Sequence, residues 1–157
     1  MILGKNVFFE GLIQRMAETH STNALSFDGI TPAQIVAREI LDYATNNVNI
    51  FWRKLSDPIL DNDLIIEGVE EALARGVSFS VFSQRENSYI TEMEILLYSY
   101  RMPVKQMRFL GKSDCNLMSC DNSAYFSWRG LKGIGDTCFN DPLTATAIQS
   151  KYGVIRQ

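Results

Sequence analysis

One stretch of the chain passes from a helical pattern to a strand pattern within a few residues: ALARGVSFSV, residues 72–81. Its first part completes an apolar stripe at helical spacing, made of Ile66, Val69 and Leu73. Gly76 then predicts the end of that helix. After it, apolar residues alternate with serines, which is the period of a strand. The stretch therefore predicts a helix that begins with Asp63 as its N-cap and ends at Gly76, followed by a strand over 77–82.

The same alternation continues on both sides of this stretch. Before it, Thr31-Pro32 begins a helix that ends near Asn46, and residues 48–52 form a strand. After it, the patterns predict a helix over about 89–100, a strand over 104–110, a hairpin of strands 115–120 and 124–128 around Asp121-Asn122-Ser123, a glycine-rich loop over 129–140, and a last helix opened by Asp141-Pro142.

Residues 1–30 follow no single pattern. Val7-Phe8-Phe9 and Leu12-Ile13 begin either a strand or a short helix, and residues 21–29 are expected to form a loop. The remaining order of elements predicts an α/β fold with a mixed, mainly parallel sheet flanked by helices on both faces. We expect one domain over 31–157, with residues 1–30 as an N-terminal extension or as the first strand or helix of that domain.

Composition sets limits on function. The chain has 157 residues and a net charge of -3, which argues against a generally basic nucleic-acid binder. The charge is uneven: residues 1–100 hold 7 Lys and Arg against 14 Asp and Glu, and residues 101–157 hold 8 against 4, which gives -7 and +4. The sequence contains neither an apolar run long enough to span a bilayer nor a signal-peptide pattern, and its three cysteines fit a reducing compartment. These features predict a cytoplasmic protein without a cofactor.

The segment Asp114-Cys115-Asn116-Leu117-Met118-Ser119-Cys120-Asp121 carries the most specific spacing in the chain. Its D-x-N, four residues and D resemble the H-x-K, four residues and D of the phospholipase D superfamily. Asp114 stands at the histidine position, Asn116 at the lysine position, and Asp121 at the aspartate position.

Other pieces fall in the order of that family. They are the run 72–81, Asn49-Ile50-Phe51-Trp52 before it, Met102-Pro103-Val104-Lys105 after it, Phe126-Ser127-Trp128-Arg129-Gly130, and Phe139-Asn140-Asp141-Pro142. The resemblance covers residues 31–157 and implies a phospholipase D-like fold. It also implies phosphodiester chemistry through a covalent phosphohistidine, with lysines on the phosphate oxygens. A chain with one copy of the motif resembles members that build the site across a homodimer.

The motif departs from that chemistry at its two reactive positions. Asp114 lacks the nucleophilic imidazole, and Asn116 lacks the charge that stabilises a transferring phosphoryl group. His20 is the one histidine and lies in the unmatched part of the chain. We therefore expect a catalytically inactive binding or scaffold module, homodimeric, with a protein or nucleic-acid partner. The alternative is a phosphodiesterase or nuclease with a replaced nucleophile, with or without a metal ion, that is active as a homodimer.

Candidate binding residues lie in loops expected at the carboxyl ends of the strands, where ligands of α/β proteins bind. They are Trp52, Arg53, Arg85, Trp128 and Arg129, with Arg on phosphate and Trp stacking on a base, or else solvated Arg and core Trp. Asp114, Asn116 and Asp121 are either oxygen ligands for Mg²⁺ or Ca²⁺, or an emptied site in which Asp121 caps a turn. Cys115, Cys120 and Cys138 are expected as buried small residues rather than zinc ligands, because no histidine lies near them.

Overall fold

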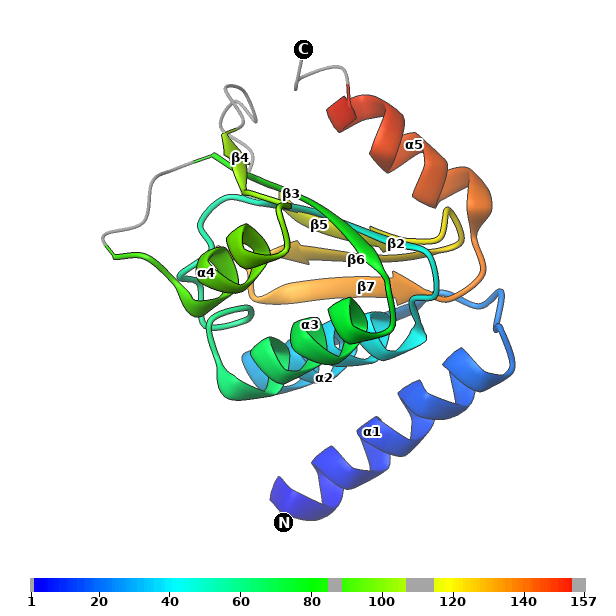
Figure 1. The fold of residues 1–157 in the computed structure, drawn as a ribbon. Helices are drawn as coiled ribbons and strands as arrows, with labels where there is room; N and C mark the ends of the chain where they lie inside the picture. The colour runs from blue at the N-terminus through cyan, green and yellow to red at the C-terminus, as the bar shows by residue number, and fades with distance from the viewer. Residues whose placement is uncertain (1, 85–88, 107–114, 154–157) are drawn as a thin grey trace.

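A computed structural model describes residues 2–84, 89–106 and 115–153 of the chain (Figure 1). Its elements in chain order are α1 (Ile2–Glu18), β1 (Leu25–Asp28), α2 (Ile30–Tyr43), β2 (Asn47–Trp52), α3 (Asp63–Ala74), β3 (Ser78–Ser83), α4 (Glu92–Ser99), β4 (Lys105–Gln106), β5 (Cys115–Cys120), β6 (Ala124–Arg129), β7 (Ile134–Cys138) and α5 (Pro142–Gly153). Within these residues no helix combines the length and the apolarity that crossing a membrane requires.

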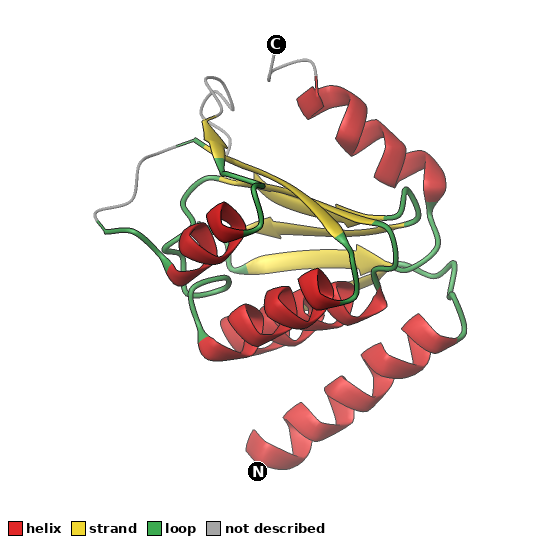
Figure 2. Ribbon diagram, in the orientation of Figure 1, coloured by secondary structure: helices red, strands yellow, loops and turns green. Residues whose placement is uncertain are grey.

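The predicted fold class is confirmed. Within the described part of the chain, one mixed sheet has the strand order β1-β7-β6-β5-β2-β3-β4. Helices α2 and α3 cover one face and α5 covers part of the other (Figure 2). The parallel part is smaller than expected: β2, β3 and β4 run parallel, whereas β5, β6, β7 and β1 join by antiparallel pairing.

The difference arises in two segments that were expected to be loops. Residues 134–138 form β7 inside the predicted glycine-rich loop, and residues 25–28 form β1 inside the predicted loop over 21–29. Each strand has weak β propensity of its own, and each is stabilised by pairing, with Phe27 opposite Gly135. The ambiguous N-terminal residues form α1, which is longer than the predicted short helix.

Residues 72–81 form the predicted end of a helix followed by a strand. Helix α3 ends at Gly76, whose φ of +88° is the left-handed conformation that glycine adopts most readily. The amides of Gly76 and Val77 donate to the carbonyls of Leu73 and Ala72, which is the hydrogen-bond pattern of a Schellman motif. Arg75 also donates to the carbonyls of Leu41 and Ala44, both at 2.9 Å, and so links α3 to the end of α2. These bonds end α3 a few residues before β3 begins at Ser78.

Two predicted helix starts were shifted by a residue or two. The N-cap of α2 is Gly29 instead of Thr31, and the N-cap of α3 is Asn62 instead of Asp63. The Asn62 side chain accepts from the amide of Ile65, whereas Asp63 places its negative charge in the first turn, where the helix dipole favours it. The predicted third helix begins at Glu92 because Thr91 and Glu94 form a capping box. Only Lys105–Gln106 of the predicted strand 104–110 is assigned as strand, and residues 107–110 lie outside the described residues.

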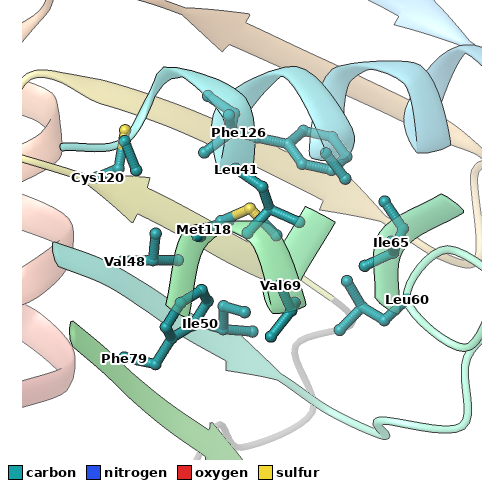
Figure 3. Packing of buried hydrophobic residues seen from close by; sticks show 14 of the residues in the cluster. Leu41, Val48, Ile50, Leu60, Ile65, Val69, Phe79, Met118, Cys120 and Phe126 are labelled. Atoms are coloured by element: carbon teal, nitrogen blue, oxygen red, sulfur yellow. The ribbon is translucent and has the colours of Figure 1, made fainter. Parts of the chain in front are cut away.

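The main hydrophobic core lies between the sheet and the helices α2 and α3. Figure 3 shows Val48, Ile50 and Met118 from the sheet packed toward Leu41 and Val69 from the helices. A smaller cluster lies on the opposite face beneath α5 and consists of Phe51, Phe82, Leu117, Tyr125, Cys138 and Ile148. Because strand residues alternate between faces, one residue of β5 points to the helices and the next to α5. Cys120 and Cys138 are buried free thiols, and the side chain of Cys115 is outside the description.

Candidate functional site

The pairing of the strands brings several sequence-predicted residues to one edge of the sheet. Trp52 and Ser83 are the last paired residues of the parallel strands β2 and β3. Because β5 runs antiparallel to β2, its first residues lie at the same edge, where Asn116 pairs with Trp128 of β6. We call this the carboxyl edge and define it by Trp52, Arg53, Ser83, Gln84, Asn116, Trp128 and Arg129. Arg85 and Asp114 lie outside the described residues.

Asn116, which the sequence resemblance aligns with the family's lysine, is buried with 3% of its surface exposed. Its Oδ1 accepts from the backbone amide of Arg53 at 2.7 Å, and its Nδ2 donates to the carbonyl of Trp128 at 3.4 Å. The carboxamide therefore links the end of β2 to the end of β6 across β5. A neutral side chain suits this position, since a buried ammonium without a carboxylate would be costly.

Asp121 lies at the opposite edge of the sheet, in the turn after β5. Its Oδ1 accepts from the amides of Asn46 and Asn47 at 2.8 and 2.9 Å. Its Oδ2 accepts from the amide and the hydroxyl of Thr45 at 2.8 and 3.2 Å. The carboxylate thus caps the start of β2. Five strand residues at about 3.3 Å each separate Asp121 from Asn116 by roughly 16 Å, so one metal ion cannot bind both.

No cluster of three or more His, Cys, Asp or Glu side chains suited to a metal ion occurs within residues 2–84, 89–106 and 115–153. This absence does not include Asp114, which lies outside the described residues. The metal alternative therefore has no group of ligands in the part of the chain that the structure describes.

The two tryptophans of the carboxyl edge belong to the core. Trp52 and Trp128 are 0% and 3% exposed. The Trp52 ring contacts Phe126 with centroids 5.8 Å apart, and the Trp128 ring stacks on Phe27 at 6.4 Å. Neither indole offers a free face on which a base could stack. The indole Nε1 of Trp52 is buried without a hydrogen-bond partner.

The arginines at this edge differ in exposure. Arg53 is half-buried, with its backbone held by Asn116 and by the Ser83 hydroxyl, which donates to the Arg53 carbonyl at 3.3 Å. Arg129 is exposed at the end of β6. Lys54, Lys105 and Lys132 are exposed cations that follow or belong to strands ending at the same edge. Asp28 and Asp57 also lie at this edge, so its positive charge is partly offset.

Sequence reasoning missed Lys132. The segment 129–140 was expected as a loop, whereas residues 130–133 are the turn between β6 and β7 and residues 134–138 are β7. The Gly133 amide donates to the Arg129 carbonyl at 2.9 Å, so this turn holds Lys132 close to Arg129. The excess of Lys and Arg over residues 101–157 was the available signal.

No protein-family model and no curated protein matches the sequence. Among solved structures, the chain is similar to TrmBL2, described as an archaeal chromatin protein that shows a novel mode of DNA binding, with a TM-score of 0.63 and 17% identity over 98% of this chain and 60% of that one.

Two further solved structures are similar. Nuc from Salmonella typhimurium, described as a phospholipase D family member, gives a TM-score of 0.65 at 13% identity, and NucT from Helicobacter pylori gives 0.63 at 12% identity. Each match covers 85% of this chain and 94% of the other. The chain thus spans nearly the whole length of these two proteins but only 60% of the chromatin protein. At these identities the likeness shows the fold, which is phospholipase D-like.

Proposed function

We propose that this chain is a phospholipase D-like binding module without phosphodiester chemistry, and that it holds nucleic acid by its phosphates at the carboxyl edge. The observation that carries the first half is the state of Asn116. Its carboxamide is buried and hydrogen-bonded to the backbone of Arg53 and Trp128. Because the carboxamide is neutral, it offers no positive charge to a phosphate.

Catalysis by this family's route needs more than a place for the substrate. A transferring phosphoryl group is stabilised by cations aimed at its oxygens, and a nucleophile must attack phosphorus. Asn116 supplies no cation, and Asp121 is engaged by four donors at the other edge of the sheet. Asp114 has a carboxylate that would repel the anionic substrate. We infer that Asn116 and Asp121 stabilise the fold instead of taking part in catalysis.

Phosphate contacts support the second half of the proposal. Arg53 and Lys54 follow β2, Arg129 ends β6 and Lys132 follows it, and β5 lies between these two strands. Such cations at one edge bind nucleic-acid backbones by releasing counterions. The buried tryptophans leave backbone contacts as the main mode, because single-strand binding by stacking needs exposed rings. Binding of DNA by the chromatin protein of the same fold is consistent with this use.

The test combines cleavage and binding. The purified chain is incubated with single- and double-stranded DNA and RNA and with a generic phosphodiester, with EDTA or with added Mg²⁺ or Mn²⁺. We expect no turnover and measurable binding by fluorescence anisotropy. Arg129→Gln should weaken binding roughly tenfold, since it removes a phosphate contact. Arg15→Gln, an exposed arginine on α1, removes the same charge elsewhere and should leave binding within about twofold.

Three outcomes would change the conclusion. Turnover that Asp114→Ala abolishes would establish the enzyme alternative. Absence of both turnover and binding would favour a protein partner. Equal losses in Arg129→Gln and Arg15→Gln would show that net charge, and not the carboxyl edge, governs affinity. The predicted homodimer is tested in the same preparation by its solution mass.

A further inference from the structure

Helix α1 is attached to the rest of the molecule by a narrow apolar strip. Ile13 and Ala17 are 0% and 4% exposed and lie in the same core cluster as Val36 and Ile40 of α2. Phe9 adds an edge contact to Phe27 with centroids 5.9 Å apart. Figure 1 shows α1 outside the layer that α2 and α3 form, with its N-terminal end pointing away from the sheet.

The chain that follows α1 is fixed. His20 has a φ of +50°, and its amide donates to the Ala17 carbonyl, which ends the helix. The His20 Nδ1 lies 2.5 Å from the hydroxyl of Tyr43 on α2. This contact joins the chain that follows α1 to α2.

A cavity of about 590 Å³ lies beside the contact between His20 and Tyr43. It is enclosed by the end of α1, by α2 and by the turn after β5. Its acidic lining comes from three segments: Glu18 of α1, Glu39 and Asp42 of α2, and Asp121 of the turn. The other lining residues are Ala17, His20, Tyr43, Thr45, Ser123 and Asn140, so among the described side chains neither Lys nor Arg lines it. Negative charges on α1 therefore face negative charges on α2, and no described cation lies between them in the cavity.

The guanidinium of Arg38, next to Glu39 in the chain, is directed toward α3. Arg38 of α2 donates to Asp42 at 3.0 Å, to the Leu64 carbonyl at 2.8 Å and to Glu71 at 2.8 Å, so its guanidinium faces α3. Glu39 is half-buried under α1. Burial first, and then the charges of Asp42, Glu10 and Glu18, raise the pKa of the Glu39 carboxyl from 4.5 to about 7, against the lowering effect of Arg38.

We propose that α1 is an arm that docks on α2 while the Glu39 carboxyl holds a proton and is released when that proton leaves. This device is independent of nucleic-acid binding at the carboxyl edge. In the released arm Glu39 meets water and no longer faces Glu10 or Glu18, so its pKa returns toward 4.5. The docked state then binds the proton more tightly. Docking is favoured at low pH and weakens as the pH rises from about 4.5 through about 7.

Release has a structural consequence. It uncovers Ile13 and Ala17 on the arm, which are buried when the arm is docked, together with the part of α2 that they contact. Between about pH 4.5 and 7 the proton's stabilisation of the docked arm falls, so a change in acidity within this range changes how much of this apolar surface meets solvent.

Amide hydrogen exchange of the full chain tests the proposal. Protection of residues 7–18 is measured between pH 5 and pH 8 and corrected for intrinsic exchange rates. We expect it to fall roughly tenfold over this range, while the amides of β2 and β3 keep their protection. Glu39→Gln keeps the shape of the side chain and removes its charge, so α1 should stay protected throughout. Glu70→Gln, on the exposed face of α3, should behave as the parent chain.

Two results would overturn the proposal. One is equal protection of α1 at pH 5 and pH 8 in the parent chain. The other is a fall in protection that persists in Glu39→Gln and disappears in His20→Asn, which would assign the response to the imidazole. Asn suits this control because it tolerates the positive φ of His20 and does not titrate.

Discussion

At the scale of single residues, Asn116 and Asp121 both stabilise the framework of the sheet. Asp121 and Asn122 are the central residues of the turn between β5 and β6, and both have a φ of +54°. The amide of Ser123 donates to the Cys120 carbonyl at 3.0 Å across this turn. Two positive φ angles are what a tight hairpin of type I′ requires, and Asp and Asn are the side chains that tolerate them best.

The cap made by Asp121 gives a direct prediction. Asp121→Asn keeps the tolerance for positive φ and removes the carboxylate that accepts from Thr45, Asn46 and Asn47. We expect a loss of about 1.5–3 kcal/mol in the free energy of unfolding, because charge-assisted hydrogen bonds contribute more than neutral ones. Urea denaturation followed by circular dichroism measures it. The neighbouring Asn122→Gly should stay within a few tenths of a kcal/mol, and a loss as large as that of Asp121→Asn would assign the effect to the turn.

The sequence allowed part of this site to be predicted. The position of Asp121 in a hairpin follows from local turn chemistry, which the sequence contains. The bond between Asn116 and the Arg53 amide depends on how β5 pairs with β2, two strands separated by more than sixty residues. No local pattern encodes that register, so the burial of Asn116 had to come from the structure.

At the scale of elements, short strands escaped prediction because pairing creates them. Residues 134–138 contain Gly135, Asp136 and Thr137, which hold no alternating apolar pattern. Gly135 is required by packing: a Cβ there would lie 2.8 Å from the Ser127 carbonyl oxygen and 2.9 Å from the ring of Phe27. A glycine that indicated a loop in the sequence thus allows β1 to lie against β7.

One side chain, Arg38, adds several polar links between α2 and α3. Arg38 is 17% exposed and bonds Asp42 on its own helix, and the Leu64 carbonyl and Glu71 on α3. Gly68 of α3 permits this close approach, since a Cβ there would lie 2.8 Å from Cδ of Arg38. Because Gly68 has no Cβ, the Arg38 guanidinium can reach its three acceptors and link the two helices.

We predict that Arg38→Met destabilises the chain by about 1.5–3 kcal/mol, because the aliphatic stem remains while the hydrogen bonds to α3 are lost. Thermal and urea unfolding measure the change. Arg101→Met, an exposed arginine after α4, should have an effect below about 0.5 kcal/mol. A loss in Arg38→Met no larger than this control would mean that apolar packing alone holds α2 against α3.

At the scale of the whole molecule, charge is distributed between two opposite edges of the sheet. Arg53, Arg129 and Lys132 lie at the carboxyl edge, and the cavity with Glu18, Glu39 and Asp42 lies at the other. The sequence indicated an imbalance along the chain, with -7 and +4 for its two parts, but linear order did not give its direction in space. The direction follows from topology, because strand ends from both parts of the chain meet at each edge.

This separation makes a prediction about salt. The strands place the two edges roughly 16 Å apart, and charges are screened beyond about 8 Å at physiological ionic strength. Removing two cations with Arg129→Gln and Lys132→Gln should therefore lower the slope of log affinity for DNA against log salt by about 1–2, as two lost phosphate contacts require. Glu18→Gln changes charge at the far edge, so it should leave the slope unchanged and raise affinity less than about twofold at 0.15 M salt. Anisotropy titrations between about 0.05 and 0.3 M salt, over which the Debye length falls from roughly 14 Å to roughly 6 Å, measure both. If Glu18→Gln altered the slope as much as the double variant, the phosphates would have to reach both edges, and the carboxyl edge could not be the binding surface.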